Sequence, residues 1–194
     1  MARKKGFRLW LSSSAVLLTV GVIVAGIAFA VLQSAPVTLA NNQISTSAGL
    51  AISLDGQNFP QSVTGFSFTG VSPGGPAFPT NGYTFYLKNT GSANLALKVS
   101  ISPAPTVTTT GPNGAAVDLN KVFFEITRMD NNATATVSLK SLIDGAATGV
   151  ALNDTINAGA TVQYSIRVQI NSDAFTAQSL SITGIGLSFS GAGA

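Results

Sequence analysis

The stretch YTFYLKNTGSANLALKVSI, residues 83–101, decides the fold. It has two arms in which apolar side chains occupy every second position. These positions are Tyr83, Phe85 and Leu87 in the first arm, and Leu95, Leu97, Val99 and Ile101 in the second. Because successive side chains of a β-strand point to opposite faces, this period of two predicts two strands, each with one buried face. The centre, Asn89–Ser92, consists of residues that favour turns, so we predict an antiparallel hairpin.

The same period recurs along the chain after residue 40. Its clearest example is 161–170, where Val162, Tyr164, Ile166, Val168 and Ile170 share one face. Further strands are predicted at 50–54, 63–71, 122–129, 134–139, 151–156 and 180–189. The segment 138–143 fits either the end of a strand or one helical turn. We therefore predict an all-β fold, an antiparallel β-sandwich with jelly-roll or Ig-like connectivity.

The N-terminal part of the chain has a different character. Four basic residues lie within the first eight, and an uncharged, mostly apolar run follows over 9–32. This pattern predicts a hydrophobic leader helix before the β-domain, either a signal peptide or a membrane anchor. The small-x-small pattern at Ala28–Ala30 favours cleavage by a signal peptidase, and 38–40 is a poorer second site. A third interpretation is a type IV pilin leader, because Lys5-Gly6-Phe7 resembles a prepilin cut site.

Two parts are therefore expected. Residues 1–40 are a signal peptide or membrane anchor with a spacer, and residues 41–194 are the β-sandwich domain. A leader of this kind implies a protein that is secreted or held at the cell surface, with the membrane as a partner if the leader is not cleaved.

Composition narrows the range of functions. The chain has no cysteine and no histidine, which removes Ser-His-Asp and Cys-His catalysis and the commonest zinc ligands. We therefore predict no enzymatic activity and no cofactor. Charged residues are only 9% of the chain, and four of the ten basic ones lie in the leader. The β-domain has no basic cluster, which argues against nucleic acid as a partner.

Several polar groups are candidate sites, each with a simpler explanation. Oxygen-bearing residues around one predicted strand could bind Ca²⁺, or could serve only as turns and caps; they are Asp118, Asn120, Asp130, Asn131 and Asn132. Two sequons, at Asn132 and Asn153, match the N-glycosylation pattern, which also arises by chance in a chain rich in Asn and Thr. Glu125, the sole glutamate, is either a carboxyl group of raised pKa or an exposed strand residue.

Aromatic residues offer one more alternative. They could form a face on which a carbohydrate stacks, although such residues more often fill a sandwich core. The residues concerned are Phe66, Phe68, Phe78, Tyr83, Phe85 and Tyr86. The only tryptophan, Trp10, lies in the leader.

The order of motifs resembles the TasA/camelysin family of secreted bacterial proteins. A basic leader ending in Ala28–Ala30 is followed by Asn41-Asn42-Gln43, and SAGLAISL at 47–54 opens the first predicted strand. Downstream, KNTGS at 88–92 precedes an alternating strand. The family's aromatic residue after the cleavage site is not evident, because Val31 follows Ala30. The resemblance implies an exported jelly-roll subunit of matrix fibres. Some members carry a metallopeptidase label, which the absence of histidine here does not support.

The segment before the β-domain suggests how such fibres would form. Residues 36–48 are uncharged, begin with a proline, and carry apolar side chains at Val37, Leu39 and Ile44. An extended segment can add to an open sheet edge of another copy, gaining main-chain hydrogen bonds and filling pockets. We predict strand donation by this segment and self-assembly into filaments. The alternatives are a disordered tether for the segment, and a membrane-anchored adhesion or carbohydrate-binding domain for the protein.

Overall fold

The computed structural model describes residues 37–40, 42–47, 49–110, 117–174 and 179–194. They belong to one unit that spans 35–194. The predicted leader helix and its cleavage site at Ala28–Ala30 lie outside the described residues. Within the described ranges, no helix has the length and apolar character needed to cross a membrane.

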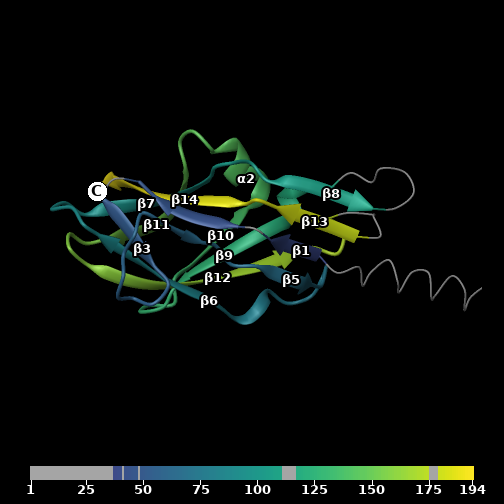
Figure 1. The fold of residues 1–194 in the computed structure, drawn as a ribbon, viewed down its shortest axis with the longest axis horizontal. Helices are drawn as coiled ribbons and strands as arrows, with labels where there is room; N and C mark the ends of the chain where they lie inside the picture. Colours follow the sequence, from purple (N-terminus) through teal and green to yellow (C-terminus); the bar gives the residue numbers. More distant parts are fainter. Residues whose placement is uncertain (1–36, 41, 48, 111–116, 175–178) are drawn as a thin grey trace, which may run out of the picture. The chain divides into compact units, whose positions relative to one another are not determined.

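The described chain is mostly β-strand, which confirms the all-β prediction (Figure 1). The strands are β1 Val37–Ala40, β2 Gln43–Thr46, β3 Leu50–Ser53, β4 Ser62–Thr64, β5 Phe68–Val71, β6 Phe78–Asn89, β7 Leu95–Ile101, β8 Thr106–Thr110, β9 Val122–Arg128, β10 Thr134–Ser138, β11 Val150–Ile156, β12 Thr161–Ile170, β13 Ser179–Thr183 and β14 Gly186–Gly193. A 3-10 turn, η1 (Leu119–Lys121), precedes β9, and a short helix, α2 (Leu139–Asp144), follows β10. Residues 138–143 therefore take the helical alternative, with Ser138 as the N-cap.

The strands form three sheets. The strand orders are β10-β9-β12-β6-β3, β11-β7-β14-β2-β4 and β5-β1-β13-β8. Most neighbours are antiparallel, but β1 pairs with β13 and β2 pairs with β14 in parallel. Two of the three sheets are thus mixed, because the N-terminal strands run beside the C-terminal ones, whereas β10-β9-β12-β6-β3 is antiparallel throughout.

The predicted hairpin at 83–101 is wrong in its pairing. Both arms are strands with the expected buried faces, but β6 pairs with β12 and β3, whereas β7 pairs with β11 and β14. The chain crosses from one sheet to another at Asn89, whose fully buried amide group donates to the carbonyls of Ala93 (2.8 Å) and Ile156 (3.0 Å). The turn residues therefore make an arch between sheets.

Two other predicted strands are each divided between sheets. The segment 63–71 becomes β4 and β5, and the segment 180–189 becomes β13 and β14. At the second division the chain passes close to Ser102: a Cβ on Gly186 would lie 1.9 Å from the Ser102 carbonyl oxygen. Only glycine fits there, so the crossing point has a steric signature that the alternation of apolar residues does not carry.

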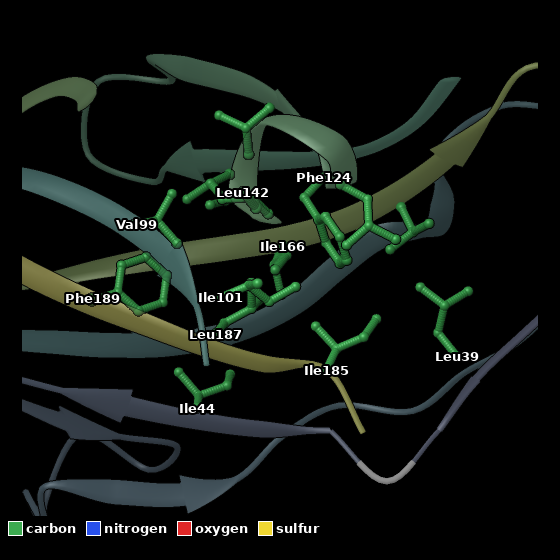
Figure 2. Packing of buried hydrophobic residues seen from close by; sticks show 14 of the residues in the cluster. Leu39, Ile44, Val99, Ile101, Phe124, Leu142, Ile166, Ile185, Leu187 and Phe189 are labelled. Carbon is green, nitrogen blue, oxygen red and sulfur yellow. The ribbon is translucent and has the colours of Figure 1, made fainter. Parts of the chain in front are cut away.

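The apolar faces of all three sheets contribute to one buried cluster (Figure 2). Phe85 of β6 packs on Phe189 of β14 with ring centroids 5.3 Å apart, which joins two of the sheets. The apolar face predicted for 161–170 is confirmed, since Val162, Tyr164, Ile166, Val168 and Ile170 are all buried, but the alternation is not complete because Ser165 of the opposite face is buried as well. The residues predicted to donate a strand lie in the same cluster.

Candidate functional site

The first candidate site consists of the two N-terminal strands, β1 and β2, which lie in different sheets. β1 lies between β13 and β5, and β2 lies between β14 and β4, so both strands have a neighbour on each side. The β-domain predicted from residue 41 thus also includes the strand Val37–Ala40. This pair is the part of the described chain that comes first in sequence, and it occupies interior positions in two sheets.

Val37, Leu39 and Ile44 have exposed fractions of 0%, 0% and 1%. In register, Val37 lies opposite Leu180, and Leu39 lies between Ile182 and Phe68. Ile44 lies between Leu187 of β14 and Val63 of β4. Figure 2 shows Leu39 and Ile44 directed into the common core. The alternate apolar side chains of this segment therefore occupy closed positions formed by the rest of the domain.

Asn42 stands where the segment passes from one sheet to the other. Its side-chain amide nitrogen donates to the main-chain carbonyl of Phe66, and its main-chain carbonyl accepts from Gly65 N at 2.7 Å. A Cβ on Gly65 would lie 2.7 Å from the Asn42 carbonyl carbon, so the two backbones approach too closely for another residue. Asn42 is only 8% exposed, so the crossing between the two sheets lies inside the folded domain.

The connection from β2 to β3 is short and contains one unusual backbone angle. Ser47 N donates to Phe189 O (2.9 Å), and Leu50 N donates to Ser47 O (3.1 Å). Gly49 has φ of +88°, a left-handed conformation that glycine adopts without strain.

The second candidate site is a polar group made by the end of β9, the turn after it, β12 of the same sheet and the edge strand β11 of another sheet. Arg128 of β9 donates to both carboxylate oxygens of Asp130 (2.7 and 2.9 Å) and to Asp154 of β11 (2.8 Å). The Tyr164 hydroxyl donates to the other oxygen of Asp154 at 2.5 Å. A pocket of about 150 Å³ lies beside them, between β10 and β11.

The pKa shifts in this group indicate that its charges stabilise the contact between two sheets. The hydrogen bond to Asp130, and then that to Asp154, raises the pKa of Arg128 above its usual value, and the same bond lowers the pKa of Asp130. Burial, followed by the bond to Asp154, raises the pKa of the Tyr164 hydroxyl. A phenol that stays protonated and an arginine held by two carboxylates offer no nucleophile or base. The group instead joins β9 and β12 of one sheet to β11 of another.

The residues considered for calcium fall into two separate places. Asp118 caps η1 by accepting from Asn120 N (3.0 Å), while Asp130 pairs with Arg128. Asn131 accepts from Ala133 N in the β9–β10 turn, and Asn132 has φ of +58° there. The contacts of Asp118 and Asn131 are those of a helix cap and a turn, which is the simpler of the two explanations offered by the sequence. Within the described ranges, His, Cys, Asp and Glu form no group of three or more suited to a metal ion.

The other candidates are placed as follows. Glu125 is half-buried and forms an ion pair with Arg167 of β12 at 2.7 Å, so it is not the exposed strand residue of the second alternative. Asn132 and Asn153 are exposed, and Asn153 lies at a register shift in β11 with φ of +52°.

The aromatic residues proposed as a stacking face are mostly packed on one another. Phe68 and Phe85 are buried in the core. Phe66 stacks on Tyr83 with centroids 4.9 Å apart, and both are partly buried against the core. This is the core alternative rather than an open platform for sugar rings.

The sequence pattern does not reveal two sets of polar contacts between sheets, those of Asn89 and those that join Arg128, Asp154 and Tyr164. It predicts only a turn at Asn89 and a buried side chain at Tyr164. A polar residue in register with a buried apolar face, as Asn89 is with Phe85 and Leu87, is the signal that could have revealed the crossing. Comparison of the sequence with protein-family models and with curated proteins finds no match.

Proposed function

We propose that this protein is an exported, non-enzymatic structural subunit that assembles into fibres of the cell surface or extracellular matrix by strand donation. The folded part would be a β-sandwich with jelly-roll connectivity, as the resemblance to the TasA/camelysin family implies. Export rests on the basic and apolar character of residues 1–32. In this proposal β1 and β2 of one copy occupy the same positions in the next copy.

One observation carries the proposal. The first described strands, β1 and β2, supply interior strands to two sheets and connect to the rest of the domain only through the turn at 47–49. Burial of Val37, Leu39 and Ile44 is worth roughly 5–9 kcal/mol in total, at about 1.5–3 kcal/mol for each side chain. The same hydrogen bonds and contacts form whether the strands come from the chain itself or from a neighbour.

Exchange between copies gives an open assembly. The donated segment and the groove that receives it are different surfaces, so the contact is head-to-tail and builds a filament unless the rotation closes a ring. The exchange requires no new complementary surface. It requires that β1 and β2 leave the neighbouring strands of their own copy and that the backbone changes direction near Gly49, a residue with the conformational freedom to do so.

A disulfide trap tests strand donation directly. Ser45 of β2 lies opposite Ser188 of β14, and both are partly exposed. The chain has no cysteine of its own, so the double variant Ser45→Cys/Ser188→Cys can form only one kind of bridge across this pair. In exported protein, strand donation predicts a ladder of covalent multimers on a non-reducing gel that collapses to a single band with reductant.

The single variants Ser45→Cys and Ser188→Cys are the matched controls, because one cysteine per chain can give dimers but no ladder. If the double variant oxidises completely and yet migrates as a monomer, each chain completes its own sheets. That outcome excludes strand donation, and with it the proposed route to fibres.

A further inference from the structure

The two sequons of the chain, Asn132–Thr134 and Asn153–Thr155, lie close together in the fold although they are far apart in sequence. The first begins in the turn between β9 and β10, and the second lies within β11. Each sequon contributes two residues to the lining of the same pocket of about 150 Å³. The two acceptor asparagines therefore lie on one side of the domain, where the edge strands β10 and β11 of two sheets are neighbours.

The side chains of Asn132 and Asn153 are available for modification. Both residues are exposed, and neither side-chain amide forms a hydrogen bond within the described part of the chain. An N-linked glycan needs such an amide, because the sugar is attached to the side-chain nitrogen. Exposure on the surface is also the structural context in which the acceptor pattern is expected to be used.

Among the described asparagines, only these two combine an available amide with the acceptor pattern. The side chain of Asn131, next to Asn132, already accepts from Ala133 N. Other asparagines outside the sequons also use their side chains in hydrogen bonds, and they are Asn42, Asn58, Asn89, Asn94 and Asn120. The remaining described ones are exposed but do not begin a sequon, and they are Asn81, Asn157 and Asn171.

The backbone at both acceptors departs from a regular strand. Asn132 has φ of +58° and Asn153 has φ of +52°, and no other described non-glycine residue has a positive φ. Asparagine tolerates this left-handed conformation better than most residues. The register of β11 against β7 shifts between Ala151 and Thr155, so Asn153 is not one of the paired positions. A glycan on either asparagine would thus leave the paired positions of β10 and β11 intact.

We propose that Asn132 and Asn153 carry N-linked glycans, which cover the side of the domain formed by the edge strands β10 and β11. In each transfer the side-chain nitrogen forms a bond to the anomeric carbon of a lipid-linked sugar phosphate, and the bond from that carbon to the phosphate oxygen breaks. The amide loses one proton, and the lipid phosphate leaves. An oligosaccharyltransferase at the outer face of the membrane catalyses the transfer, so the modification rests on the export that is part of the proposed function.

Glycans at these positions would protect two sheet edges. An open edge is a template on which another chain can pair, and charged side chains are one usual protection. Asp154 is the only charged residue of β10 and β11, and its charge is paired with Arg128. A bulky, hydrophilic glycan supplies the protection that charge does not. In the sheet β11-β7-β14-β2-β4, two strands separate β11 from β2, so the glycans would leave the position of β2 accessible for strand donation.

Mass spectrometry of tryptic peptides tests the modification at each site. Residues 129–140 contain Asn132, and residues 141–167 contain Asn153, so trypsin separates the two sites. In protein isolated from the cells that make it and from their medium, we expect both peptides to be heavier by one or more sugars on these asparagines. Asn131 and Asn157 lie in the same peptides as internal controls and should be unmodified. Finding either peptide only at its unmodified mass overturns the assignment of its asparagine.

Variants of the first sequon separate N-linked transfer from other modifications. Thr134→Ala destroys the acceptor pattern but keeps Asn132, and it should return peptide 129–140 to its unmodified mass. Thr134→Ser preserves the pattern and should keep the glycan. Asn131→Gln replaces the neighbouring asparagine and should also keep it. A sugar that survives Thr134→Ala contradicts N-linked transfer to Asn132.

The double variant Asn132→Gln/Asn153→Gln tests the protection of the edges. Without its glycans the protein should aggregate earlier than the wild type, as measured by light scattering. Asn131→Gln/Asn157→Gln is the matched control, because it makes the same number of substitutions and keeps both sequons. Equal aggregation of the two double variants would show that glycans do not protect these edges. The disulfide ladder across β2 and β14 involves neither sequon, so failure of either proposal leaves the other standing.

Discussion

Two connections in this protein have the same length and similar turn residues, yet they do different things. Residues 90–94 join β6 to β7, and residues 129–133 join β9 to β10, five residues in each case. β9 and β10 pair as an antiparallel hairpin, whereas β6 and β7 enter different sheets. Alternating arms around an Asn-containing turn are therefore compatible with both a hairpin and an arch.

The hydrogen bonds of the two connections explain the difference. In the hairpin two bonds close the turn locally, because Arg128 N donates to Ala133 O and Ala133 N donates to the Asn131 side chain, each at 2.9 Å, and one bond, from Met129 N to Gln163 O (2.9 Å), reaches the neighbouring strand β12. In the arch, Thr90 N donates to Gly49 O (2.9 Å), and the Asn89 side chain donates to Ile156 O (3.0 Å). The arch is held by parts of the chain distant in sequence, so its stability depends on the tertiary fold.

The strands on either side of the two connections also differ in how much apolar surface they bury. In the arch, both strands bury a continuous apolar face, and Phe85 reaches across to Phe189 of another sheet. In the hairpin, β10 has one buried residue, Val137. Two strongly apolar arms bury more surface in separate sheets of a shared core than side by side in one sheet.

The largest expected effect comes from a charge placed in the core, either in an arm of the arch or in β12, which pairs with the other arm. Leu97→Asp in β7 and Ile166→Asp in β12 each put an unpaired carboxylate at a position that is 1% and 0% exposed. Lost burial and charge desolvation together cost about 5 kcal/mol or more, comparable to the stability of a domain. We expect both variants to be unfolded at 25 °C by circular dichroism. Ser100→Asp, on the opposite face of β7, should stay folded, and a folded Leu97→Asp would refute the face assignment.

The second prediction compares the two turn asparagines. Asn89→Leu removes the donor to the Ala93 carbonyl and to the buried Ile156 carbonyl, which should cost roughly 2–4 kcal/mol. Asn131→Ala removes one exposed bond to Ala133 N and should cost less than about 1 kcal/mol. Urea denaturation of both variants measures the difference. Equal losses would show that the arch and the hairpin are held by equivalent turn interactions.

The third prediction concerns the base of the hairpin. Arg128 and Asp154 have side chains only 19% and 16% exposed, and their ion pair joins two sheets. Arg128→Met should lower the free energy of unfolding by about 1.5–3 kcal/mol, because the half-buried Asp154 carboxylate loses its charged partner and keeps only the bonds from the Tyr164 hydroxyl and Thr155 N. Lys140→Met removes an exposed pair with Asp144 within α2 and should change stability by less than about 0.5 kcal/mol. If the two variants lose the same stability, the Arg128 group does not join the sheets.

The smallest effect is a dependence on pH within the hairpin turn. The hydrogen bond from Arg128 lowers the pKa of Asp130 below 3.8, its value in an unstructured chain. The stabilisation is therefore complete above about pH 4 and is lost as the pH falls through the lower, folded-state pKa. Asp130→Asn should melt slightly below the wild type at pH 7, and the gap should close as the pH falls through the lowered pKa of Asp130 in the folded state. A gap that widens in acid would contradict this sign.

Local alternation in the sequence determined a large part of this protein. It predicted the all-β class, the strands at 95–101 and 161–170, and which of their side chains are buried. Val37, Leu39 and Ile44, the residues predicted to donate a strand, are the apolar side chains of a polar segment, and all three are buried. These properties depend only on residues a few positions apart, since the period of a strand is local.

The tertiary structure decided which strands are neighbours. It made an arch of the predicted hairpin, divided 63–71 and 180–189 between sheets, and placed β1 and β2 in parallel beside the C-terminal strands. It also brought Arg128, Asp154 and Tyr164 together from three strands. Strand pairing and buried polar contacts link residues far apart in the chain, and their free energy depends on the complete core. A period of two cannot encode that choice, because every strand with one apolar face carries the same signal.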